Sequence, residues 1–180
     1  MIGYEFMKLE PESCLAHLHS TPINVDRYLI CTGYLAGKSI DEIRSDHLAE
    51  TFSRNFAEIA RFCDKVFAIR PEARVCIIGS ESGFAGSYDM AYAGAKAAIH
   101  LYIETKRLKY AEQMIVGIAP GIIWDSNMTQ SRDDRELLSD VSDHNRLGRW
   151  ISAKEVAELA HYLLMEASPA VSGQIIRMRP

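Results

Sequence analysis

The sequence has few of the features that mark membrane spans or nucleic-acid binding. No apolar run approaches the about 18 residues that cross a bilayer, and MIGYEFMKLEPES at the start lacks the basic flank and long apolar stretch of a signal peptide. Twenty Lys and Arg stand against 24 Asp and Glu without a basic cluster. We therefore expect a cytoplasmic protein with no membrane and no nucleic-acid partner.

Cysteine and histidine are too scattered to indicate a disulfide framework or a metal site. The four cysteines, at positions 14, 31, 63 and 76, form no C-x-x-C pair, and the six histidines form no H-E-x-x-H pattern. Cys31 and Cys76 fall in apolar, strand-like runs, where a thiol acts as a small hydrophobe. We expect reduced core thiols and no metal site.

What the sequence does have is an alternation of short apolar runs and longer amphipathic segments. Strands are predicted over 2–8, 27–31, 75–78, 115–119 and 174–178, and helices over 47–68, 90–111 and 153–165, with a short one ending at His19. Near-continuous apolar strands separated by helices favour a parallel sheet covered on both faces. The prediction is an α/β fold, a single domain over 1–180 with a polar, irregular stretch at 122–150.

Tyr92 and Lys96 stand one turn apart on the helix predicted over 90–111. Residues i and i+4 share a helix face, and an ammonium beside a phenol favours the phenolate and lowers its pKa. A tyrosine shifted down from its ordinary value near about 10 can act as a general acid and base at neutral pH. The alternative is a chance pair on a solvated helix face.

Three other features stand where ligands bind in open α/β sheets, or on the helices beside them. Ser80 follows a buried strand and opens a glycine-rich loop, which is either a ligand-facing hydroxyl or a plain turn with a helix cap. Ala119-Pro120-Gly121 ends another strand and either lets backbone approach a ligand or simply stops the ladder. Asn55 falls on an apolar stripe. Because an unpaired buried amide costs about 1–3 kcal/mol, it should bond a backbone carbonyl or a trapped water, unless it is partly exposed.

One segment imitates a phosphate-binding P-loop. Residues 32–39, TGYLAGKS, follow a predicted strand and differ from that motif by Thr for the first glycine. A P-loop helix should begin at Lys38 and Ser39, but Ile40-Asp41 interrupts it, and no second carboxylate for magnesium follows a strand end. We therefore expect an ordinary loop here.

Taken in order, these segments resemble the short-chain dehydrogenase/reductase family, over roughly residues 5–180. Cys31-Thr32-Gly33 resembles the family's Asn-Ala-Gly turn, and Tyr92-Ala-Gly-Ala-Lys96-Ala-Ala resembles its Tyr-x-Ser-Ala-Lys-Ala-Ala block. The remaining matches are Asn55 on the intervening helix, Ser80 (with Ser82 as a fallback hydroxyl), the 118–121 Pro-Gly turn, and the C-terminal segments 146–149, 155–157 and 172–174.

The resemblance implies a Rossmann-like sheet that binds NAD or NADP and transfers a hydride to or from a small carbonyl or alcohol substrate. It implies that Tyr92 is the general acid and base and that Lys96 holds the nicotinamide ribose and lowers the pKa of Tyr92. Ser80 would polarise the carbonyl, and Asn55 would anchor a proton-relay water. The implied cofactor-binding residues are Thr32, Gly33, Tyr92, Lys96, Pro120 and Gly121, and 122–150 would be the substrate loop.

The resemblance also implies a homodimer or homotetramer formed through the helices over 47–68 and 90–111. Their phenylalanine-rich and alanine-rich sequences suit packing against symmetry mates.

The family's G-x-x-x-G-x-G turn, which seats the pyrophosphate at a helix N-terminus, has no counterpart among the eleven glycines. Gly33 and Gly37 begin such a spacing, but residue 39 is Ser. The first βαβ unit, ~30 residues or more, is missing, and Met1 to Leu9 resembles the family's third strand. We expect that strand beside 27–31 or in a neighbouring subunit, and dinucleotide binding that is weak or partner-dependent. The alternative is a catalytically silent binding or assembly protein on the same scaffold.

Overall fold

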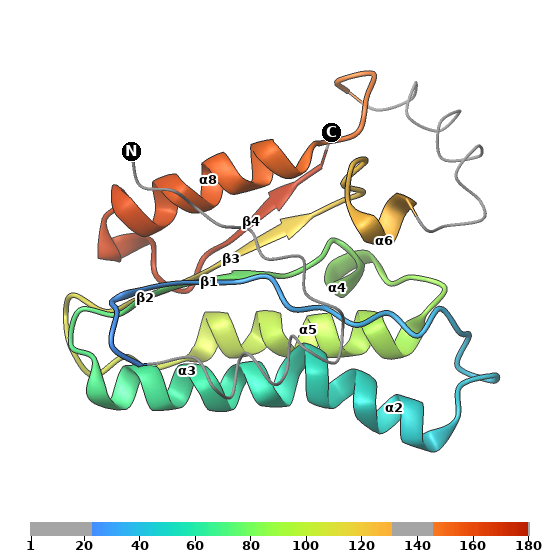
Figure 1. Ribbon diagram of the computed structural model, residues 1–180, viewed down its shortest axis with the longest axis horizontal. Helices are drawn as coiled ribbons and strands as arrows, with labels where there is room; N and C mark the ends of the chain where they lie inside the picture. The colour runs from blue at the N-terminus through green and yellow to red at the C-terminus, as the bar shows by residue number, and fades with distance from the viewer. Residues whose placement is uncertain (1–22, 131–145, 180) are drawn as a thin grey trace.

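The computed structural model describes residues 23–130 and 146–179, and its centre is a parallel four-stranded sheet in the order β1-β2-β3-β4. The strands are β1 (Arg27–Ile30), β2 (Arg74–Ile78), β3 (Met114–Pro120) and β4 (Ile175–Met178). Helices cover both faces (Figure 1), which confirms the predicted α/β architecture. The expected strand at 2–8 and the short helix ending at His19 lie outside the described residues.

One face of the sheet is covered by α5 (Met90–Thr105) and by a long helix in three consecutive parts, α2 (Ser45–Phe52), η1 (Ser53–Ala57) and α3 (Glu58–Ile69). Its apolar stripe packs Ile59, Cys63 and Val66, all fully buried, against the sheet. Removing such side chains from water contributes about 1.5–3 kcal/mol each. The helix predicted over 47–68 is confirmed, with a π-turn at η1 that the periodicity did not indicate.

The opposite face is covered by α8 (Ala153–Met165), whose bounds match the prediction. Val156, Ala160 and Leu163 lie in one buried cluster with Val116 and Ile118 of β3. The two clusters use alternate residues of the same strands, because successive side chains of a strand point to opposite faces. The middle strands β2 and β3 are therefore buried on both faces, which is why their sequences are almost continuously apolar. The outer strand β1 alternates exposed and buried residues.

The helix predicted over 90–111 ends at Thr105, six residues early. The buried Gln113 stabilises the loop that replaces its last turn: Gln113 Oε1 accepts from the N–H groups of Lys109 and Tyr110 at 3.0 and 3.2 Å. Gln113 Nε2 donates to the carbonyl oxygens of Phe67 and Arg70 at 2.7 and 2.8 Å. These bonds offer the backbone an alternative to further helical turns.

Two smaller expectations are also corrected. Cys31 is not a core thiol: it follows β1 and is exposed, whereas Cys63 and Cys76 are buried as expected. The stretch over 122–150 is not irregular throughout, because α6 (Asn127–Gln130) forms where the Ser126 hydroxyl accepts from Thr129 N–H at 3.2 Å. Residues 131–145 of that stretch lie outside the described part of the chain.

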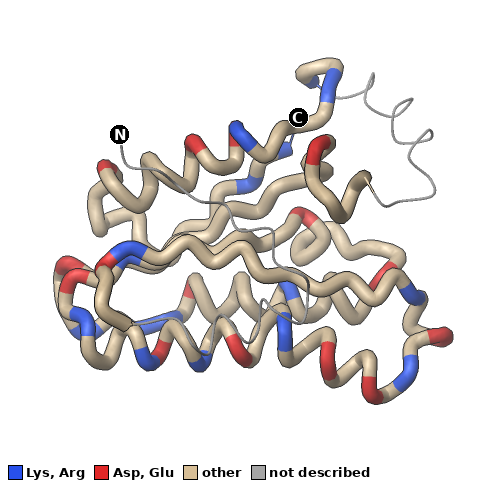
Figure 2. Tube along the Cα trace, viewed as in Figure 1, with Lys and Arg blue, Asp and Glu red and all other residues tan. Residues whose placement is uncertain are grey.

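Lysine and arginine are interspersed with aspartate and glutamate along the described chain (Figure 2). Several opposite charges pair, as in Arg70 with Asp26 at 2.6 Å and Arg54 with Glu50 at 2.5 Å. In residues 23–130 and 146–179, no helix combines the length and the apolar character that crossing a bilayer requires.

Candidate active site

The predicted site residues gather at one edge of the sheet, where three neighbouring strands end. Thr32 and Gly33 follow β1, Ser80 follows β2, and Pro120 closes β3 with Gly121 next to it. Carboxyl ends of parallel strands share one edge, and ligands of open α/β sheets bind there. The helix α5, which carries Tyr92 and Lys96, packs against the chain that leaves β2.

Ser80 and Tyr92 meet at this edge, where the Ser80 hydroxyl acts on the neighbouring Tyr92 phenol and favours its ionised form, which lowers the pKa of Tyr92. The loop between them is one residue shorter than the family pattern, and it closes through a single helical turn, α4 (Ser82–Ala85), and through Gly86 at φ +80°. A positive φ of this kind favours glycine. The hydroxyl paired with Tyr92 is that of Ser80 rather than that of the fallback Ser82, whose N–H donates to Ser80 Oγ at 3.2 Å.

The pKa of Tyr92 is raised, not lowered. Burial is the largest cause, the Ser80 hydroxyl opposes it, and the Asp89 carboxylate adds to it. The Lys96 ammonium lies 5.7 Å from the centroid of the Tyr92 ring. The expectation that Lys96 brings this pKa below its ordinary value is therefore wrong for the described chain, because loss of water around the phenolate raises the pKa more than the Ser80 hydroxyl lowers it.

Lys96 is almost completely buried, with 2% of its surface exposed. Its Nζ donates to the carbonyl oxygen of Ile78 at 3.0 Å. Burial lowers the pKa of this ammonium to about 8, because a charged group loses hydration in the interior. The Lys96 ammonium therefore loses its charge as the pH rises through about 8. Its Nζ lies at the end of β2, where the Ser80 loop begins.

Asn55 has no exposed surface and lies within the π-turn η1. Its Oδ1 accepts from Tyr34 N–H at 3.0 Å, and its Nδ2 donates to the carbonyl oxygens of Tyr34 and Thr51 at 2.8 and 2.9 Å. The prediction that a buried Asn55 bonds backbone carbonyls is confirmed, and the alternative of a partly exposed side chain is wrong. π-turns of this kind occur often at functional sites.

The turn after β1 brings Asn55 and Lys96 to the same place. A methyl group built on Gly33 would lie 3.8 Å from both Asn55 Oδ1 and Lys96 Nζ. Next to it, the Thr32 hydroxyl is buried and has no hydrogen-bond partner among the described residues. An unpaired hydroxyl beside an ammonium fits a ligand with several polar oxygens, such as the ribose half of a nicotinamide nucleotide.

The Pro-Gly turn is held by its neighbours. Glu81 N–H donates to the Pro120 carbonyl oxygen and Gly121 N–H donates to the Met178 carbonyl oxygen, each at 2.9 Å. The turn therefore both stops β3 and ties it to the Ser80 loop. Its position at the sheet edge agrees with the predicted approach to a cofactor, which stays a prediction.

The P-loop alternative is excluded by the local geometry. The first helix after residues 32–39 begins at Ser45, six residues beyond Ser39. Gly37 N–H donates to Asp89 Oδ2 at 2.9 Å, so this amide is not free for a phosphate. The other oxygen of Asp89 accepts from Tyr92 N–H at 2.9 Å and caps α5. Sequence reasoning overlooked Asp89, although an Asp at this spacing is a common helix cap.

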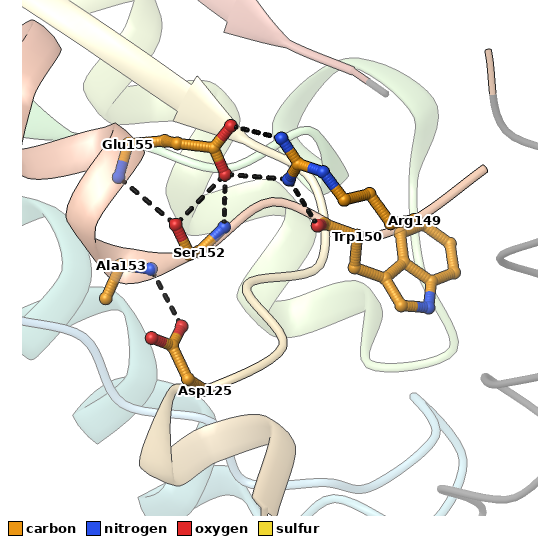
Figure 3. Close-up of polar contacts among 6 residues, drawn as sticks. All are labelled: Asp125, Arg149, Trp150, Ser152, Ala153 and Glu155. Carbon is orange, nitrogen blue, oxygen red and sulfur yellow. Dashed lines mark hydrogen bonds and ion pairs between the residues drawn. The ribbon is translucent and has the colours of Figure 1, made fainter. Parts of the chain in front are cut away.

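Hydrogen bonds hold together the two described ends of the predicted substrate loop (Figure 3). Trp124 N–H donates to the Ile151 carbonyl oxygen at 2.9 Å. Asp125 Oδ1 accepts from Ala153 N–H at 2.7 Å, as Figure 3 shows. Beside them, Arg149 forms a two-pronged ion pair with Glu155 at 2.8 and 2.9 Å. Glu155 also completes a capping box with Ser152, so the loop leaves and rejoins the fold at one place.

The sequence model of the family described as enoyl-(acyl carrier protein) reductase matches residues 12–178. The chain belongs to the short-chain dehydrogenase/reductase family. It is 26% identical over 145 residues to the chloroplastic tropinone reductase homologue of Arabidopsis thaliana, covering 77% of this chain and 45% of that protein. The chain thus spans less than half the length of the curated relative it matches.

Solved structures of this family share the fold. The NADP-bound 3-oxoacyl (acyl-carrier-protein) reductase from Agrobacterium tumefaciens superposes with a TM-score of 0.78 at 23% identity, covering 94% of this chain and 69% of that one. NAD⁺-bound xylitol dehydrogenase gives 0.75 at 18% identity, covering 94% and 75%. The Rossmann-like architecture of this short-chain dehydrogenase/reductase is therefore established, as the resemblance implied.

Proposed function

We propose that the chain catalyses the NAD(P)-linked interconversion of a carbonyl and an alcohol on a small molecule, with Ser80, Tyr92, Lys96 and Asn55 as its site residues. The observation that carries this proposal is the neighbouring pair of Ser80 and Tyr92 hydroxyls beside a buried lysine at the carboxyl edge of the sheet. Membership of the family supports it, as do the dinucleotides named with its structural neighbours.

In the reduction direction, bound NADH or NADPH supplies the hydride that adds to the carbonyl carbon. Ser80 donates a hydrogen bond to the carbonyl oxygen, and Tyr92 transfers its phenolic proton to that oxygen as negative charge develops there. Because burial keeps Tyr92 protonated at neutral pH, the phenol is already in the form that a general acid needs. The Lys96 ammonium supplies positive charge near the phenolate that is left behind.

Asn55 and Lys96 have roles outside the reacting atoms. The Asn55 side chain hydrogen-bonds the backbone of Tyr34 and Thr51. These bonds fix the conformation of the turn that carries Thr32 and Gly33. Lys96, with the free hydroxyl of Thr32, would hold the nicotinamide ribose, and Pro120 and Gly121 would line the same half of the cofactor. Residues 23–130 and 146–179 contain no G-x-x-x-G-x-G turn for the pyrophosphate, so weak or partner-dependent binding is expected.

Calorimetric titration with NADH and with NADPH tests cofactor binding directly. Submillimolar affinity that Lys96→Ala weakens about tenfold or more would support the proposal, because that variant removes the buried cation. Absence of binding up to several millimolar would favour a catalytically silent binding or assembly protein, or a chain that needs a partner for its nucleotide half.

Activity is tested by following oxidation of NADH or NADPH with a panel of carbonyl compounds. The relatives' names suggest a 3-oxoacyl thioester, a bicyclic aminoketone and a sugar ketone as first members. Tyr92→Phe should lower kcat by about 10²–10⁴, the usual contribution of a positioned general acid. Tyr162→Phe, on the exposed surface of α8, is the matched control and should leave kcat unchanged. Equal activity in Tyr92→Phe and wild type would refute the role of Tyr92.

A further inference from the structure

A third polar residue continues the line of Tyr92 and Lys96 along α5. His100 follows Lys96 by one helical turn, on the same face, and is buried with 4% of its surface exposed. Its Nε2 accepts a hydrogen bond from the backbone N–H of Ser80 at 3.3 Å. The acceptor must be an unprotonated nitrogen, so the proton of a neutral ring is on Nδ1. That Nδ1 is buried and has no partner within the described part of the chain.

The Ser80 loop is shaped around the imidazole. A methyl group on Gly79 would lie 2.3 Å from His100 Nε2, and one on Gly83 would lie 2.6 Å from His100 Cε1. Side-chain carbons do not approach other atoms so closely, so both positions need glycine. His100 occupies the space at Gly79, and at Gly83 the ring shares it with the Lys96 backbone, 2.9 Å away. The loop therefore touches the ring on both sides of Ser80.

The His100 ring is the innermost of three stacked planar groups. Phe84 of the loop stacks on His100 with ring centroids 4.5 Å apart and planes 28° apart. The Arg177 guanidinium of β4 lies 4.3 Å from the Phe84 centroid, and it pairs with Glu81 at 2.6 and 2.8 Å. Such stacking favours a fixed orientation of planar groups, so contacts through His100 and Phe84 connect α5, the loop and β4.

We propose that His100 is a positioning residue for Ser80: its neutral imidazole holds the Ser80 N–H and so keeps the Ser80 hydroxyl on Tyr92. This rests on the proposed function of Ser80. The charged groups that face the ring are Lys96 on its own helix, Glu81 in the loop and Arg177 on β4. Burial, Lys96 and Arg177 lower the pKa of His100 to about 4, against Glu81, so the accepting form prevails at neutral pH.

A matched pair of amide variants tests the proposal. The side-chain oxygen of His100→Gln reaches the place of Nε2, whereas that of His100→Asn reaches only the place of Nδ1. We expect His100→Gln to keep kcat within about threefold of wild type and His100→Asn to lose tenfold or more, with similar Kd for dinucleotide. In a Ser80→Ala background, His100→Asn should add no further loss, because the residue acts through Ser80. His161→Gln, exposed on α8, is the control.

Two readouts do not depend on activity. Nitrogen-15 NMR of wild-type His100 should show a neutral ring with its proton on Nδ1, and hydrogen exchange at the Ser80 amide should accelerate tenfold or more in His100→Asn but not in His100→Gln. A proton on Nε2, equal exchange in both variants, or an equal kcat loss from His100→Asn with and without Ser80 would overturn the proposal. An inactive wild type with the expected tautomer and exchange would instead overturn the proposed function.

Discussion

The buried ammonium of Lys96 makes a quantitative prediction about stability. Its pKa falls from 10.5 to about 8 in the folded chain because the group is buried. At about 1.4 kcal/mol for each pH unit, that fall disfavours the charged form by about 3 kcal/mol. Lys96→Met removes the charge and the hydrogen bond to Ile78 while keeping a side chain of similar length. The part of its effect on stability that changes with pH reports this electrostatic cost.

The sign follows from proton linkage. Between pH 8 and 10.5 the unfolded chain still binds a proton at Lys96 that the folded chain has lost, so wild-type stability gains from this group as the pH rises. Lys96→Met has no such gain. The free energy of unfolding of Lys96→Met minus that of wild type should therefore be largest near pH 7 and shrink by about 3 kcal/mol by pH 10.5.

The assay is urea unfolding followed by circular dichroism at several pH values from 7 to 10.5, for both proteins. Groups common to the two proteins cancel in the difference. Lys154→Met, at a side chain that is 82% exposed, is the control and should show a difference that does not depend on pH. If the Lys96→Met difference were also flat within about 0.5 kcal/mol, Lys96 would not be a buried cation, and the proposed site would lose its positive charge.

Further predictions concern the loop after α5, the packing around His100 and the assembly. Gln113→Leu should lower the free energy of unfolding by about 3 kcal/mol in urea titrations, because it leaves buried carbonyls unpaired; a loss under 0.5 kcal/mol would contradict this. Gly83→Ala should lower the melting temperature by about 4 °C or more through its clash with His100, and adding His100→Ala should recover part of that loss. Light scattering at micromolar concentration should give a dimer or tetramer, and Leu101→Glu on the exposed face of α5 should give a monomer; a monomeric wild type would contradict the predicted interface.

Much of the fold follows from local sequence patterns. The helix over 153–165 was predictable to the residue because its apolar stripe begins at the Ser152 cap, with Glu155 three residues on. Strands β2 and β3 were recognisable because they are buried on both faces and hence almost wholly apolar. Strand β1 was recognisable as a short apolar run, although its residues alternate between exposed and buried. Asn55 stood out as a candidate buried amide because it interrupts an apolar stripe, but only the structure decided between burial and partial exposure. Periodicity and capping act over a few residues, so they are legible in the sequence.

What the sequence could not provide depends on residues that are distant along the chain. The end of α5 at Thr105 depends on Gln113 bonding Phe67 and Arg70 as well as its own loop. The raised pKa of Tyr92 depends on how completely separate segments exclude water from it. The contact of His100 with the Ser80 loop depends on the close approach of Gly79 and Gly83 to a ring some twenty residues further along the chain. Residue types and their order determined the family and the fold, whereas burial and close approach, which exist only once the segments are packed together, decided the chemistry at the edge of the sheet.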